Sequence, residues 1–342
     1  MMKCWSWRAI VRCILYAGIA GYVMSLLINM PGRSRRGELP PLVPRETALA
    51  EALRRDVVRL AGEIGPRHLW EPASMQAAVA LITAAFTNAG LAVVHHAYTV
   101  GAMTCINVEA TLPGVVRPKE IVLIGAHYDS VSETPGADDN ASGVAGLLAL
   151  ARAAAGCQPA RTLRFVAFAN EEPPFFQTAN MGSMAYAAHC RARGDSITAM
   201  ICLEMLGYYS DEDDSQQYPA VLGAVLRQFF PSRGDFIGLT ANLRSIRLLR
   251  RVTGAFRRAT QFPSQGAVLP EVLSGMSDNY AFWRHGYPAV MVTDTAMFRN
   301  PYYHTPEDRP DTLDYARMAR VVAGLEAVMM ELAGGAKATD AP

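Results

Sequence analysis

Apolar and polar residues of this 342-residue chain recur with two different spacings. Helical spacing indicates amphipathic helices, and short apolar or alternating runs indicate strands. The predicted helices are residues 46–64, 74–89, 141–155, 181–191, 245–260 and 312–332. The predicted strands are residues 91–100, 106–112, 121–124, 162–168, 197–205 and 289–292. Residues 209–236 and 262–279 follow neither spacing and are expected to form rim or lid loops.

Strands that are separated by helices predict an α/β fold. We expect a three-layer architecture, in which a mostly parallel, twisted sheet carries helices on both faces. Active sites of such sheets lie beyond the carboxyl ends of the strands. Polar residues that directly follow a predicted strand are therefore the first candidates for chemistry.

The start of the chain carries a long apolar run. Residues 13–30 contain no charged residue, and as a helix they would measure roughly 27 Å, about the thickness of the hydrocarbon core of a membrane. They follow a short basic segment, residues 1–12, and predict one transmembrane anchor. A cleaved signal peptide, which usually has a shorter apolar core, is the first alternative, and a buried core helix is a weaker one. Three basic residues lie on each side of the run, so charge does not decide its orientation.

Beyond this run the composition changes. Residues 31–44 hold four prolines and two glycines, which predicts an extended, solvated linker. The working domain is expected over residues 45–335, with a short tail at residues 336–342.

Charge and cysteine content exclude several classes of function. Lys and Arg total 32 against 31 Asp and Glu, so no basic field exists to attract nucleic acid. The six cysteines lack C-x-x-C spacing, which argues against both a disulfide framework and a cysteine zinc site.

Acidic residues and histidines gather where strands are expected to end. His127 and Asp129 are two residues apart, so in an extended chain the carboxylate could hold the imidazole in one tautomer; a surface hydrogen bond is the alternative. Asp138, Asp139 and Asn140 lie between glycines at the start of a predicted helix. They indicate either helix capping or a tight turn that presents an oxygen ligand.

Further carboxylates follow two other strands. Glu171 and Glu172 are adjacent and repel each other, so a cation should compensate them, and one could bind it while the other faces water. Glu204 ends an apolar run, a costly place for a carboxylate unless a metal or an arginine pairs with it. His304 lies in a polar loop, where it is either solvated or a further ligand.

Five of these residues form a coherent ligand set. Two imidazoles and three carboxylates suit zinc, and they can hold two ions when one carboxylate bridges. The candidate ligands are His127, Asp139, Glu172, Glu204 and His304.

Six stretches between residues 60 and 330 carry a family resemblance: AHYDS, GADDNASG, NEEPPFF, LEMLGYY, SDNYAFW and YYHTPEDRPDTLDY. They resemble the co-catalytic di-zinc exopeptidases, the family of bacterial leucyl aminopeptidases, with glutamate carboxypeptidase and glutaminyl cyclase as more distant members. The resemblance implies that Asp139 bridges two zinc ions, with His127 and Glu204 completing one site. Glu172 and His304 would complete the other.

The resemblance also implies the catalytic roles. Glu171 would be the general base that takes a proton from a zinc-bridging water, and Asp129 would orient His127. The Asp139–Asn140 peptide is expected to be cis. Asn140, Asp278 and Tyr303 are expected beside the metals or in the substrate pocket.

Two stretches depart from the family pattern. Asn279 stands where many relatives have histidine, which puts a role of that side chain in doubt. Pro173, Pro174, Phe175 and Phe176 replace a glycine-rich turn and are expected to reshape the substrate pocket.

These observations predict a membrane-anchored, zinc-dependent exopeptidase, an aminopeptidase rather than a carboxypeptidase, with its catalytic domain outside the cytoplasm. The expected partners are a peptide substrate and a lipid bilayer. A glutaminyl-peptide cyclase with one zinc and a non-catalytic receptor-like ectodomain are the alternatives. The sequence indicates neither the preferred side chain nor an oligomeric state.

Overall fold

The computed structural model describes residues 7–220 and 223–334. The helices are α1 (Trp7–Ile28), α2 (Pro44–Val57), α3 (Pro72–Asn88), α4 (Gly143–Ala154), α5 (Gly182–Arg193), α6 (Gly223–Phe229), α7 (Ile246–Ala259), α8 (Glu271–Ser274), α9 (Asn279–Arg284) and α10 (Tyr315–Ala333). The strands are β1 (Ala92–Val100), β2 (Met103–Leu112), β3 (Arg117–His127), β4 (Arg161–Phe168), β5 (Ser196–Glu204), β6 (Ile237–Ala241), β7 (Ser264–Val268) and β8 (Ala289–Thr293). Two π-helical segments, η1 (Val58–Ile64) and η2 (Ala137–Ser142), continue α2 and precede α4.

The strands form one eight-stranded sheet in the order β1-β2-β4-β3-β5-β8-β6-β7. The four central strands, β4, β3, β5 and β8, are parallel to one another, as predicted. Strands β6 and β7 are also parallel, but β2 pairs antiparallel with β1 and β4, and β6 pairs antiparallel with β8, so the sheet is mixed. The reversal at one edge follows from a tight hairpin, since a short turn can join only antiparallel neighbours.

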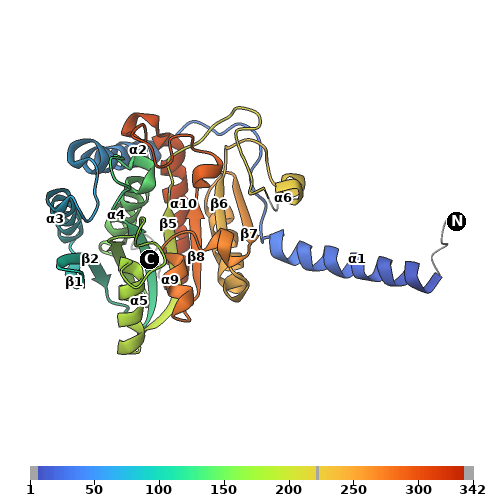
Figure 1. Cartoon of the computed structure of the whole chain (residues 1–342), viewed down its shortest axis with the longest axis horizontal. Coiled ribbons are helices and arrows are strands. Elements are labelled where there is room, and N and C mark those ends of the chain that lie inside the picture. The colour runs from blue at the N-terminus through green and yellow to red at the C-terminus, as the bar shows by residue number, and fades with distance from the viewer. Residues whose placement is uncertain (1–6, 221–222, 335–342) are drawn as a thin grey trace, which may run out of the picture.

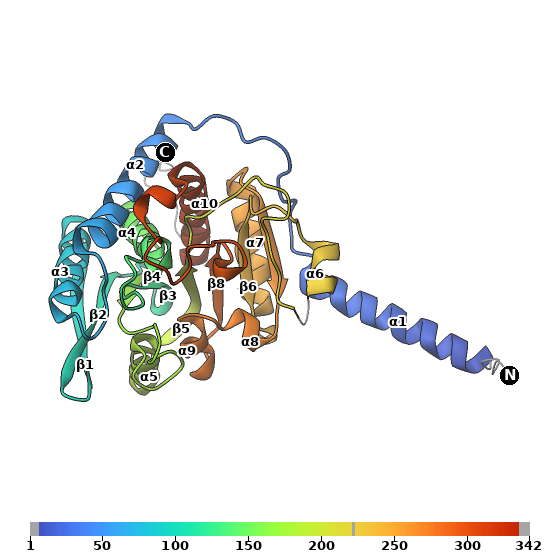
Figure 2. The same ribbon diagram turned by 45° about the horizontal axis from the view of Figure 1, so that its top comes forward.

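Helices cover both faces of the sheet, which confirms the predicted three layers (Figure 1). On one face, α3, α4, α10 and α7 follow one another from β1 toward β7, and α2 packs on α4 and α10 (Figure 2). On the other face, α5 and α9 pack together against β2, β5 and β8. The central strands are consequently buried on both sides and read as continuous apolar runs.

The register of the central strands sets the position of the site. His127, the last residue of β3, lies opposite Phe168 at the end of β4, and Glu204 lies opposite Thr293 at the ends of β5 and β8. The carboxyl ends of four neighbouring strands therefore meet at one edge of the sheet.

The sequence pattern missed the short elements of this fold. Residues 209–236 contain α6, and residues 262–279 contain β7 and α8, although the pattern predicts loops for both stretches. Strands β6 and β7 are five residues long and each includes a glycine, so neither repeats an apolar period often enough to be recognised.

The N-terminal helix differs from the predicted anchor. Helix α1 begins at Trp7 and includes Arg12, whereas the uncharged run covers residues 13–30. Among the described residues, no helix reaches the combination of length and apolarity that crossing a membrane requires.

The end of the predicted anchor and the start of the linker, residues 31–44, which was expected to be solvated, both pack on the domain. Met30 is buried against β7, where a side chain at Gly266 would lie 2.5 Å from Met30 Cγ. The guanidinium of Arg257 in α7 donates to the carbonyl oxygens of Met30, Pro31 and Gly32 at 3.1, 3.3 and 3.2 Å. The chain that follows α1 is therefore held on the face formed by α7 and β7.

Candidate metal centre and active site

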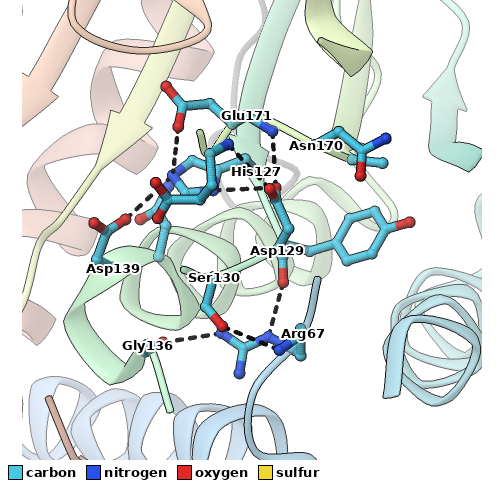
Figure 3. Close-up of polar contacts among 12 residues, drawn as sticks. Arg67, His127, Asp129, Ser130, Gly136, Asp139, Asn170 and Glu171 are labelled. Carbon is cyan, nitrogen blue, oxygen red and sulfur yellow. Dashed lines mark hydrogen bonds and ion pairs between the residues drawn. The ribbon is translucent and has the colours of Figure 1, made fainter. Parts of the chain in front are cut away.

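His127 lies at the middle of the site, fully buried at the end of β3. Its Nε2 is 3.3 Å from Oδ1 of Asp139 and 3.4 Å from Oε2 of Glu204. Its Nδ1 is 3.4 Å from Oδ1 of Asp129, on the side away from Asp139 (Figure 3). Carboxylates from the turn after β3, from η2 and from the end of β5 thus meet at one imidazole.

A second group shares Asp139 with the first. His304 Nε2 lies 3.1 Å from Oδ2 of Asp139 and 3.3 Å from Oε2 of Glu172. Asp139 directs one carboxylate oxygen to each histidine. All five ligand residues expected from the sequence are therefore together, with Asp139 between the two groups.

Several atoms of this cluster lack the partners that buried polar atoms usually have. Within residues 7–220 and 223–334, no hydrogen-bond partner exists for either ring nitrogen of His127, for Oδ1 of Asp139 or for Nε2 of His304. The ligand atoms of His127, Asp139 and Glu204 lie within 4.8 Å of one another, as do those of Asp139, Glu172 and His304. Unpaired nitrogens and carboxylate oxygens at this spacing fit zinc, so these residues could hold metal ions.

The pKa values of the cluster without a metal also indicate that it can bind cations. Burial and the charge of Asp139 raise the pKa of Glu172 to about 8. Burial opposes a charge on His304, but the nearby carboxylates of Asp139 and Glu172 outweigh this effect and raise the pKa of His304 to about 10. Without a cation, protons must neutralise part of the negative charge.

Glu171 lies beside the metal ligands, with Oε2 3.9 Å from Nε2 of His127. Burial raises its pKa well above the usual carboxylate range, and the charges of Glu204 and Glu172 act in the same direction against the opposing effect of His127. A carboxyl group with a raised pKa at a metal centre is suited to proton transfer near neutral pH.

Two other carboxylates fix the backbone that carries the ligands. Asp129 accepts the backbone N–H groups of Glu171 and Glu172 at 3.1 and 3.0 Å. Asp308, which the sequence analysis did not single out, accepts those of Asp138 and Asp139 at 2.9 and 3.1 Å. The only sequence signal for Asp308 is its place four residues after His304.

Asn140 braces the end of β5 rather than lining a pocket. Its amide donates to the carbonyl oxygen of Leu203 at 2.9 Å, and its Oδ1 accepts the N–H of Met205 at 3.1 Å. The Asp139–Asn140 peptide is cis, as expected. Ser277 donates a hydrogen bond to Glu204, whose position is therefore set from two sides.

Arg67 is the residue that sequence reasoning missed most clearly. Its guanidinium is fully buried and donates to five carbonyl oxygens, among them those of Tyr128 at 2.8 Å and Pro135 at 2.7 Å. Burial lowers its pKa to about 10, although neighbouring carboxylates such as Asp129 act against this. It ties the turn after His127 to the segment before Asp139 (Figure 3), and no local pattern marked it.

An apolar cavity opens beside Glu204. Its wall includes Phe230, Phe236, Leu273, Met276 and Met291, and Tyr303 also borders it. The ring of Tyr303 stacks on His304, with centroids 3.7 Å apart. Asp278 lies fully buried close to Glu204, and burial raises its pKa to about 7.

A model described as Peptidase family M28 matches residues 107–329, more than half of the chain. The chain belongs to peptidase family M28. This M28 chain is accordingly a metallopeptidase, a hydrolase of peptide bonds, which confirms both the family and the enzyme class predicted from its motifs.

Relatives extend this picture. The chain is 36% identical over 295 residues to the uncharacterized protein YfbL of Escherichia coli K12, which covers 83% of this chain and 88% of that protein. It is 28% identical over 232 residues to leucine aminopeptidase 1 of Trichophyton rubrum, covering 63% of this chain and about half, 55%, of the fungal protein. The zinc aminopeptidase BSAP of Bacillus subtilis shares the fold, with a TM-score of 0.67 at 16% identity over 86% of this chain and 96% of that one.

Proposed function

We propose that this M28 metallopeptidase is a zinc-dependent aminopeptidase that removes bulky apolar residues from the N-terminus of peptides. The observation that carries the proposal is the apolar cavity directly beside Glu204 and Tyr303. A cavity with this wall accepts an apolar side chain, and Glu204, one of the candidate zinc ligands, lies at its border.

The charge of the site favours a free amine over a free carboxylate in the substrate. None of the described residues that line the cavity is Lys or Arg, and Glu204 is among them. Arg67 donates to carbonyl oxygens and so cannot serve as a carboxylate clamp. The positively charged α-amine of a peptide would therefore rest against carboxylates, as an aminopeptidase requires.

Five side chains would hold zinc in two sites. His127 and Glu204 would form one site with Asp139, and Glu172 and His304 would form the other with the second oxygen of Asp139. When bound, zinc polarises a carbonyl and lowers the pKa of water. The position of Asp139, with one oxygen toward each histidine, supports a count of two ions.

Proton transfer falls to Glu171. It would take a proton from the attacking water and deliver it to the leaving amine, which requires a carboxyl group that both accepts and returns a proton near neutral pH. Its burial and its raised pKa in the metal-free chain suit that exchange. Asp129 would keep Glu171 in place through the backbone hydrogen bond and would orient His127.

The proposal is tested with the full chain, dialysed against a chelator and then assayed with and without zinc. Leucyl peptides should be hydrolysed only after zinc is restored. They should react about 10- to 100-fold faster than N-acetylated ones, because acetylation removes the charge of the amine and leaves the carboxylates of the site without that partner. Release of residues from the carboxyl end would overturn the aminopeptidase assignment. Pyroglutamyl products would support a cyclase, and a chain that takes up no metal would support a receptor. Membrane attachment and a location outside the cytoplasm stay predictions.

A further inference from the structure

We propose that an exposed aromatic shelf, formed by Trp70, Phe175 and His68, binds the substrate residue on the carboxyl side of the scissile bond and selects apolar or aromatic side chains there. This inference rests on the proposed function, because it assumes a peptide that crosses the metal centre. The rings are in contact: the Trp70 and Phe175 centroids are 5.8 Å apart, and the His68 and Trp70 centroids are 6.0 Å apart.

The shelf is exposed although its side chains are large and apolar. Trp70 is 58% exposed, and Phe175 is half-buried. Indole rings usually lie largely buried, so a solvent-facing one that stacks on a second aromatic ring marks a surface for contact with another molecule. Phe175 belongs to the Pro173–Phe176 segment that departs from the family pattern. The proposed shelf assigns this segment a role in substrate binding.

Both sides of the shelf are fixed to the backbone of the site. Phe175 donates its N–H to the carbonyl oxygen of Glu172 at 2.9 Å, only three residues after this candidate ligand. Trp70 follows Arg67, whose backbone N–H donates to Ser130 Oγ at 3.0 Å and whose Nε donates to Tyr128 O at 2.8 Å. The two loops that carry the shelf are thus hydrogen-bonded through their backbones to the segments that form the site.

The shelf and the apolar cavity border different parts of the centre. The cavity touches Glu204 and Tyr303, and none of the three shelf residues lines it, whereas Phe175 is hydrogen-bonded through its backbone to Glu172, whose side chain groups with Asp139 and His304 and also with His127 and Glu171. Asp139 lies between the two groups. A peptide with its N-terminal side chain in the cavity and its scissile bond near Asp139 would therefore place its next residue over Glu172, toward Phe175 and Trp70.

The test compares Leu-Phe with Leu-Gly, which share the N-terminal residue. Both are titrated by calorimetry into the zinc-loaded full chain carrying Glu171→Gln, so that binding is measured without turnover. Leu-Phe should bind about 2- to 10-fold more tightly, as expected for one aromatic stack. Adding Trp70→Ala should abolish the difference and leave Leu-Gly unchanged, whereas Trp70→Phe should keep most of it.

The control is Val116→Ala, an exposed apolar residue just before β3 begins, at the opposite end of the strand from His127, and it should change neither affinity. Equal binding of the two dipeptides, or a preference that survives both Trp70→Ala and Phe175→Ala, would overturn the shelf. If the wild-type chain hydrolyses neither dipeptide while the preference in binding persists, the proposed function fails and the shelf stands. Binding of neither dipeptide overturns both.

Discussion

Two clusters of buried polar residues lie on the same sheet and are built in opposite ways. In the first, between β2, β4 and α5, Glu109 accepts hydrogen bonds from Tyr186 at 2.7 Å and Thr111 at 2.8 Å and contacts His96 at 2.8 Å. Arg164 lies 3.3 Å from Glu109 and donates to Asp195 at 2.7 Å. Each carboxylate there has a cationic partner within the protein.

The metal centre has carboxylates in excess. Asp129, Asp139, Glu171, Glu172 and Glu204 are all buried within one site. The buried guanidinium nearest to them, that of Arg67, donates to carbonyl oxygens instead. These five buried carboxylates share two imidazoles and no guanidinium, so negative charge remains in excess and the cluster is suited to binding cations.

The largest expected effect is a loss of activity, and it should arise from a substitution in the metal centre and not in the Glu109 cluster. Glu171→Gln should lower kcat by about 10²- to 10⁴-fold, because the amide cannot accept a proton from water. Zinc content, measured by atomic absorption, should stay at the wild-type value, because Glu171 is not among the five proposed ligands. A Glu171→Gln variant that turns over as fast as wild type would assign the base elsewhere.

The next largest effect is on the stability of the fold and is expected for the Glu109 cluster. Glu109→Ala should lower the free energy of unfolding by about 3–5 kcal/mol, measured by urea denaturation, because it leaves Arg164 buried with one of its two carboxylate partners missing. The hydrolysis rate per folded molecule should not change. Glu120→Ala, which removes a partly exposed partner of Arg161, is the matched control and should cost at most about 1 kcal/mol. A loss of zinc with Glu109→Ala would show that the clusters are not independent.

The smallest effect is the number of protons that the metal centre releases when it binds zinc. At pH 7 the metal-free centre holds protons, because the pKa values of Glu172 and His304 are about 8 and 10, so zinc uptake should release roughly one or more protons per chain. Calorimetry in two buffers of different ionisation enthalpy measures this number. Uptake of protons on zinc binding, or no change in bound protons, would contradict the proposal that protons neutralise the excess carboxylate charge before zinc binds.

Glu109 provides the contrast in pH. Burial alone would raise its pKa, but the hydrogen bond to His96 and the charge of Arg164 outweigh burial and lower the pKa from 4.5 to about 2. A lowered carboxyl pKa stabilises the fold above the unfolded value, so this contribution should be complete above pH 4.5 and lost as the pH falls toward 2. It should involve no proton exchange near pH 7.

The sequence predicted those parts of the fold in which the apolar spacing repeats several times. Helices α3, α4, α7 and α10 and the central strands lie where the apolar period places them, because a buried face must repeat over several turns or residues. The five-residue strands β6 and β7, the helix α9 and the docking of Met30 were not predicted, since their contacts come from residues far away in the chain.

By itself, the sequence determined which carboxylates and histidines follow which strands of this M28 chain. These positions predict the ligand set, and the family resemblance predicts the role of Glu171. Strand ends and ligand types are local properties, so motifs reveal them. Only the tertiary structure decided how Asp139 stands between two histidines, that Arg67 and Asp308 hold the turns, and that Trp70 meets Phe175 beside Glu172. Each of these depends on segments brought together by the parallel register of the sheet, and no local spacing encodes that register.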